Sequence, residues 1–115
     1  MFESMTNANT DVIQGTLDML ILKTLSLRPL HGFGIARRVE QITDGVFKVN
    51  PGSLLTALQR LERAGLLDSE WCQTENSRKA KFYTLTAAGR KQLRVETTDW
   101  KRRAGAIARL LEMEG

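Results

Sequence analysis

The stretch from Asn50 to Arg63 combines a strong helix start with a row of hydrogen-bonding side chains. Asparagine accepts free N–H groups at an N-cap, and Pro51 loses no hydrogen bond at the first helical position. Gly52 and Ser53 are small enough to let this first turn approach a partner closely. At 100° per residue, the face opposite the leucines carries Gly52, Thr56, Gln59, Arg60 and Arg63. Amide and guanidinium groups can pair with the edges of adenine and guanine or with phosphate.

A second set of cations lies on a predicted β-hairpin. Residues 66–72 and 78–85 are rich in β-forming side chains and flank the polar run 73–77, which is typical of a hairpin with a mobile tip. The returning strand places three cations at or near that tip: Arg78, Lys79 and Lys81. Such cations suit sequence-independent contact with phosphate or with the minor groove.

Residues suited to catalysis or to metal binding are few. Zinc takes about four N, O or S ligands, and one cysteine with one histidine cannot supply the usual set. No Gly-rich phosphate loop and no paired nucleophile and base accompany His31 or Cys72, so neither an enzyme nor a cofactor is predicted.

We expect His31 in the first turn of a helix, where its side chain is either near a phosphate or hydrogen-bonded locally. Cys72 is expected in a half-buried strand, with redox sensing as the alternative.

Three helices must precede the hairpin. A capping box at Asp11 and Gln14 predicts the start of the first helix, and Arg28-Pro29 ends it. The apolar face of this helix is Leu17, Leu20, Ile21, Thr24 and Leu25. A short second helix over residues 31–42 would brace the third. Its predicted inner stripe is Ile35, Val39 and Ile42.

A final helix is predicted from a cap at Thr86 to about Glu112. Its apolar residues alternate in steps of four and three, the spacing of a coiled-coil seam. The members of this seam are Leu93, Thr97, Trp100, Ala104, Ile107 and Leu111. The seam is too short for an isolated coiled coil, so it is expected to pack on its own domain or on a second copy. Trp100 is expected in the core or at a dimer seam, with an aromatic-lined effector pocket as the alternative.

Length, composition and charge limit the overall organisation. A chain of 115 residues has room for one domain, and its single cysteine indicates a reducing compartment. Residues 1–10 resemble a flexible polar leader without a targeting signal, and no stretch is apolar enough to span a membrane, so we expect a cytoplasmic protein.

Residues 77–115 carry ten Lys/Arg and four Asp/Glu, whereas residues 1–76 have a net charge of −2. A localised basic stripe favours a nucleic-acid partner, and a solvated basic helix face is the plainer alternative.

The order of these elements predicts a mainly α fold with a small β-hairpin. A winged helix-turn-helix would occupy residues 11–85, and a dimerisation helix residues 86–115. We expect double-stranded DNA to contact His31, Asn50, Gly52, Ser53, Thr56, Gln59, Arg60, Arg63, Arg78, Lys79 and Lys81. For Gly52 and Ser53 the alternative is a simple helix cap, and for Arg60 and Arg63 a solvated surface.

Three runs form one collinear block over about residues 14–100: HGFGIARRVEQITDGVFKVNPGSLLTALQRLERAGLL, EW and NSRKAKFYTLTAAGRKQL. Together they resemble the PadR family of bacterial transcriptional regulators. The most specific pieces are His31-Gly32-Phe33-Gly34-Ile35, Pro51-Gly52-Ser53-Leu54, Leu58 with Arg60-Leu61-Glu62, and Tyr83-Thr84-Leu85-Thr86 with Gly89. The single terminal helix resembles the smaller subfamily, whose members dimerise through this helix and the first one.

The resemblance implies a homodimeric repressor that binds a palindromic operator and that a small effector can release. The implied dimer contacts are Leu17, Leu20, Leu93, Trp100, Ala104, Ile107 and Leu111, with Trp100 also as the effector contact. The family commonly has tyrosine and proline where this chain has Leu55 and Thr56, and tyrosine where it has Phe33. The family's operator sequence is therefore not expected to apply unchanged. The alternative function is a winged-helix module that binds proteins and has no specific DNA site.

Overall fold

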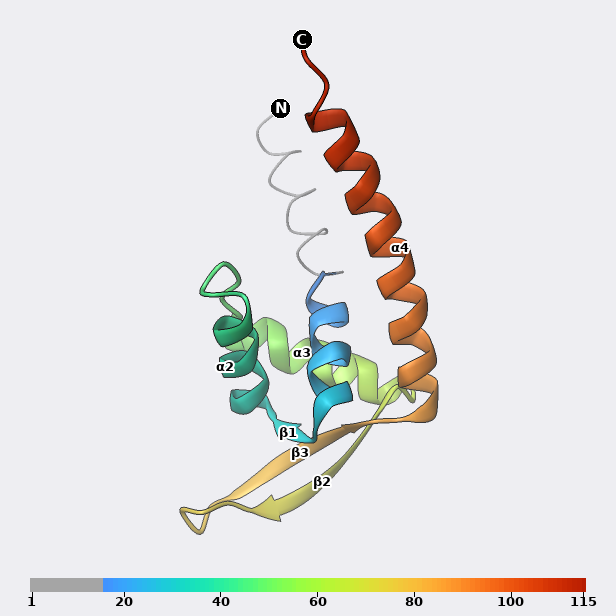
Figure 1. Ribbon diagram of the computed structural model, residues 1–115. Helices are drawn as coiled ribbons and strands as arrows, with labels where there is room; N and C mark the ends of the chain where they lie inside the picture. Colours follow the sequence, from blue (N-terminus) through green and yellow to red (C-terminus); the bar gives the residue numbers. More distant parts are fainter. Residues whose placement is uncertain (1–15) are drawn as a thin grey trace.

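The computed structural model describes residues 16–115, so the predicted leader and the capping box at Asp11 and Gln14 lie outside the described residues. A helix over residues 16–27 comes first. The elements that follow are β1 (Leu30–His31), α2 (Gly32–Ile42), α3 (Pro51–Arg63), β2 (Leu67–Gln73), β3 (Lys79–Leu85) and α4 (Ala87–Leu111). The first three helices lie on one side of a small sheet, and α4 leaves the domain (Figure 1). This arrangement is a winged helix-turn-helix with a long C-terminal helix.

The sheet has three antiparallel strands in the order β1-β3-β2. Strands β2 and β3 form the predicted hairpin, here called the wing, whose pairing runs from Leu67 opposite Leu85 to Gln73 opposite Lys79. Strand β1 pairs Leu30 with Tyr83. The sequence did not predict β1, because a strand of two residues is too short to show the alternation that marks strands.

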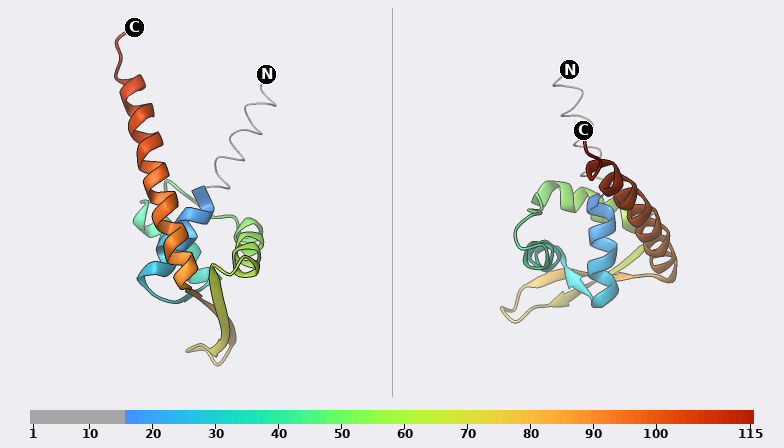
Figure 2. Two further views of the ribbon diagram at one scale, coloured as in Figure 1. Left: turned by 90° about the vertical axis from the view of Figure 1, so that its right-hand side faces the viewer. Right: turned by 45° about the horizontal axis from the view of Figure 1, so that its top comes forward.

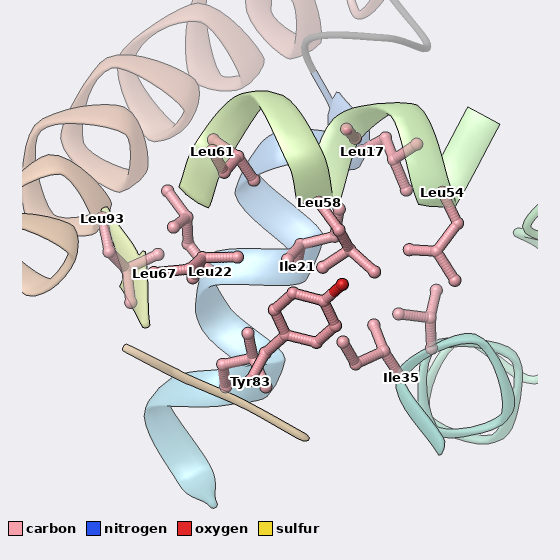
Figure 3. Close-up of a cluster of buried hydrophobic side chains, with 13 residues drawn as sticks. Leu17, Ile21, Leu22, Ile35, Leu54, Leu58, Leu61, Leu67, Tyr83 and Leu93 are labelled. Atoms are coloured by element: carbon pink, nitrogen blue, oxygen red, sulfur yellow. The ribbon is translucent and has the colours of Figure 1, made fainter. Parts of the chain in front are cut away.

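The core joins the three helices to the sheet. Ile21, Ile35 and Leu58 are almost fully buried, and the ring of Tyr83 points among them from β3 (Figure 3). The prediction that Ile42 completes the inner stripe of α2 is wrong, since its side chain is 58% exposed. Ile42 is the last residue of α2, and the chain then turns away through Asp44 and Gly45, both of which have positive φ.

The start of α4 is fixed to the end of α3. The Thr86 hydroxyl accepts a hydrogen bond from the Gly89 N–H at 2.9 Å and donates one to the Gly65 carbonyl at 2.8 Å. The backbone N–H of Thr86 donates to the Leu66 carbonyl at 3.1 Å. A Cβ at Gly89 would lie 2.2 Å from the Leu66 carbonyl oxygen, so only glycine allows this approach. The predicted N-cap at Thr86 is therefore confirmed.

Most of α4 does not pack on the domain. Only Gly89 and Leu93, both near its start, are buried. The helix has 25 residues, which at 1.5 Å each gives about 37 Å. Its C-terminal half runs away from the other helices (Figure 2, left). This half therefore presents its side chains to solvent in the single chain.

Candidate nucleic-acid interface

The first turn of α3 is capped as the sequence predicts. The Asn50 side-chain oxygen accepts the Ser53 N–H at 3.1 Å, and the Asn50 carbonyl accepts the Leu54 N–H at 2.9 Å. Because Pro51 has no N–H, Gly52 supplies the one free backbone donor of this turn. A phosphate at the start of α3 would thus meet a single N–H group, fewer than the sequence suggested.

The solvent face of α3 carries the predicted small and polar side chains. Gly52, Ser53, Thr56, Gln59 and Arg63 are all exposed. The Thr56 hydroxyl donates to the Gly52 carbonyl at 3.0 Å, so its proton is already used within the helix. Within residues 16–115, Arg63 forms no ion pair. Gln59 and Arg63 are therefore the long polar side chains of this face that remain available to a partner.

Arg60 lies on the flank of α3 next to the N-terminal helix. Its two terminal nitrogens donate to the two carboxylate oxygens of Asp18 at 2.7 and 2.8 Å. The hydrogen bond to Asp18 raises the pKa of Arg60. A bidentate pair of this geometry uses the two inner Nη–H donors and leaves Nε–H and the outer Nη–H groups as the donors still open to a base. The sequence did not indicate Asp18 as a partner, since the two residues lie in different helices.

The three predicted wing cations divide into two kinds. Arg78 and Lys79 are exposed, and neither forms an ion pair in the part of the chain that the structure describes. Lys81 is half-buried, and its ammonium lies 3.1 Å from a carboxylate oxygen of Glu62 on α3. The hydrogen bonds from Ser69 and Lys81 lower the pKa of Glu62. Lys81 thus fixes the wing to α3, while the other two cations face solvent.

His31 is bonded locally at the start of α2. Its Nδ1 accepts the Gly34 N–H at 3.0 Å and caps the helix. Its ring packs against that of Phe82 in an edge-to-face arrangement, with centroids 5.1 Å apart. A neutral imidazole that accepts at Nδ1 carries its proton on Nε2, which can still donate to an anion.

A cavity of about 630 Å³ separates the start of α3 from the wing and is here called the α3–wing groove. Leu54, Leu58 and Tyr83 contribute apolar surface to it. Phe33 and Leu55 also line it and are 73% and 53% exposed. The cations Arg78 and Lys79 lie along the same groove. The groove therefore combines an apolar lining with positive charge.

The predicted dimerisation residues also divide. Leu17 and Leu93 are buried in the core of their own domain, and Leu20 packs against that core. Ala104 is half-buried on α4. Trp100, Ile107 and Leu111 are 45%, 56% and 78% exposed. The exposed seam of α4 is thus Trp100, Ala104, Ile107 and Leu111.

A half-buried carboxyl group, that of Glu96, lies where α4 leaves the domain. Burial and the nearby charge of Asp18 raise the pKa of Glu96. Its Oε2 is buried and has no hydrogen-bond partner among the described residues. Burial likewise raises the pKa of the Cys72 thiol, with the charge and hydrogen bond of Glu70 adding to the effect.

None of the described helices is both long and apolar enough to cross a membrane. Residues 16–115 contain no group of three or more His, Cys, Asp or Glu side chains that could hold a metal ion. The features that stand out are an exposed polar face on α3, a basic wing, and the groove between the wing and the start of α3. Such a fold and surface define the class of winged helix-turn-helix DNA-binding regulators.

Within that class, residues 21–95 match the Transcriptional regulator PadR-like family, and the chain belongs to this family. Its members are transcriptional regulators and not enzymes. A transcriptional regulator from Clostridium thermocellum superimposes with a TM-score of 0.80 at 25% identity, over 89% of this chain and 96% of that one.

Two further proteins illustrate the range of relatives. A PadR family transcription regulator from Clostridium difficile superimposes with a TM-score of 0.72 at 26% identity, over 83% of this chain and 97% of its own. A 37.1 kDa protein from a transposon of Streptomyces fradiae is 35% identical over 89 residues, which is 77% of this chain. The match spans only 24% of that longer protein.

Proposed function

We propose that this DNA-binding regulator acts as a homodimeric repressor that recognises a palindromic operator. The observation that carries the proposal is the α3–wing groove. Leu54 and Leu55 at the start of α3 line one side of it, and Arg78 and Lys79 line the other. The same helix presents an exposed polar face to solvent next to this groove. A helix that presents small and polar side chains fits the major groove, and flexible cations beside it suit phosphate.

The proposed contacts follow from what each side chain is free to do. Gln59 is assigned to an adenine edge and Arg63 to a guanine edge or a phosphate, because neither is held by the domain. Arg78 and Lys79 are assigned to phosphates, as are the Gly52 N–H and His31 Nε2. Asn50, Ser53 and Thr56 are assigned to positioning and close approach. Arg60 and Lys81 have partners within the domain and are assigned to holding α3 and the wing in place.

The dimer is proposed to form through the exposed seam of α4. Trp100, Ile107 and Leu111 place large apolar surface in water along one line of the helix. Burying such a seam against a second copy removes this cost. A two-fold dimer presents two copies of α3 and therefore requires an operator with two-fold symmetry. An effector that binds beside Trp100 at this seam would change the separation of the two copies.

Selection of bound duplexes from random DNA tests the proposal. Recovery of a palindrome whose half-sites lie about 34–36 Å apart, one turn of DNA, is the expected result. Failure to recover any enriched sequence would instead favour the alternative, a winged-helix module that binds a protein. In a promoter assay, added chain is expected to lower transcription from a template that carries the recovered site.

A further inference from the structure

We propose that Leu55 determines operator specificity by contacting the C5-methyl group of a thymine in the major groove. This inference rests on the proposed function, because it assigns a DNA partner to the start of α3. Leu55 is 53% exposed on that helix, although leucine is normally buried. Its neighbours Leu54 and Leu58 face the core, so the exposure of Leu55 is not a frayed end of the core stripe.

The first two turns of α3 offer few hydrogen-bond donors to a base. Pro51 and Gly52 have no polar side chain, and the Thr56 hydroxyl already donates to the Gly52 carbonyl. Ser53 is the only residue there with a short polar side chain that remains free to donate. Recognition by this part of the helix must therefore rely mainly on apolar contact.

Charge near Leu55 indicates which partner covers it. Leu55 lines the α3–wing groove together with Arg78 and Lys79, which have no acidic partners among residues 16–115. Cations beside an exposed apolar side chain suit a polyanion that also carries an apolar group. On the major-groove edges of duplex DNA, that group is the C5-methyl of thymine, and 5-methylcytosine presents the same group.

The test uses the full chain and the duplex recovered by selection. Each thymine of one half-site is replaced in turn by uracil, which removes the methyl group and keeps the base pair. One replacement should weaken binding by the wild type about fourfold, the factor that corresponds to about 0.8 kcal/mol for a buried methyl. At the same position, 5-methylcytosine should bind about fourfold more tightly than cytosine.

Leu55→Ala should bind the thymine and uracil duplexes equally, and Leu27→Ala is the matched control. Leu27 is 55% exposed, nearly the same fraction as Leu55, and it lines a different cavity beside Arg28. This control variant should keep the fourfold preference for thymine. Thermal unfolding of both variants near the wild-type temperature shows that each is folded.

Other outcomes would overturn the inference. The methyl contact is excluded if the wild type binds every uracil duplex as tightly as the thymine duplex, or if the half-site contains no thymine. Either result leaves the proposed function standing. A thymine preference that persists in Leu55→Ala assigns the methyl to another residue. If no duplex is bound specifically by the wild type, the proposed function itself fails.

Discussion

Arg60 of α3 and Asp18 of the N-terminal helix form a bidentate ion pair, with N–O distances of 2.7 and 2.8 Å. The pair lies on the flank of α3 that faces away from the wing. It ties the helix proposed to enter the major groove to the helix that packs behind it. The position of α3 therefore depends on a contact between residues far apart in the sequence, as well as on the apolar core.

The first prediction concerns this pair. Arg60→Ala and Asp18→Asn should each lower the free energy of unfolding by about 1 kcal/mol or less, since the arginine is partly exposed. The double variant should lose less than the sum of the two single variants. Urea denaturation of the four proteins measures this coupling. Additive losses would show that the pair contributes nothing to stability.

The second prediction concerns Glu96 and pH. Burial and Asp18 raise the pKa of this carboxyl in the folded chain, so the folded state binds a proton more readily than the unfolded state does. Stability due to this group is therefore greatest below its ordinary pKa of 4.5 and falls as pH rises through the raised value. Glu96→Gln should melt at a higher temperature than the wild type at pH 7. The difference in melting temperature between Glu96→Gln and the wild type should vanish below pH 4.5. An equal difference at pH 7 and below pH 4.5 would contradict a raised pKa for Glu96.

The third prediction concerns two glycines of α4. Alanine at Gly89 would place a Cβ 2.2 Å from the Leu66 carbonyl oxygen, and such overpacking costs about 1–3 kcal/mol. At Gly105, apart from the chain neighbours and the backbone of the helix itself, a Cβ would meet only the end of the flexible Arg109 side chain, 3.8 Å away. Gly105→Ala should therefore raise stability by up to about 1 kcal/mol, the helix preference of alanine over glycine. Melting curves of the two variants should shift in opposite directions, and a shift in the same direction would be inconsistent with the close approach at Gly89.

The fourth prediction concerns the seam of α4. The wild type should sediment as a species of twice 12.9 kDa at micromolar concentration. Ile107→Asp should shift it to a single chain, because a charge would be buried at the interface. Val95→Asp is a control, because Val95 is also 56% exposed but lies off the seam. The proposed interface would be excluded if both variants sediment as single chains, or if the wild type itself sediments as a single chain.

Local patterns in the sequence predicted most of the fold. Asn50-Pro51 and Thr86 fixed the starts of α3 and α4, because caps depend on residues only a few positions apart. The apolar spacing also placed Leu54, Leu58 and Leu61 in the core. Strand β1 was missed because two residues carry no periodic signal.

Contacts between distant residues account for what the sequence did not predict. The partners of Arg60 and Lys81 lie 42 and 19 positions away, and local spacing contains no information about such pairs. Helical spacing correctly marked Leu17 and Leu93 as apolar contacts. It could not distinguish the core of the same domain from a second copy, since both bury the same kind of surface.

In the proposed complex, α3 and the wing bind DNA together, α3 by reading the base sequence and the wing by its positive charge. The most direct test is the affinity of the selected operator and of a shuffled duplex, measured against salt for the wild type and for Arg78→Ala/Lys79→Ala. The wild type should prefer the operator, and the slope of log affinity against log salt should be steep. The double variant should keep the preference but lose about 1.8 from the slope per subunit, since each phosphate contact contributes about 0.9. Equal affinity of the wild type for both duplexes, or an unchanged slope in the variant, would contradict the claim.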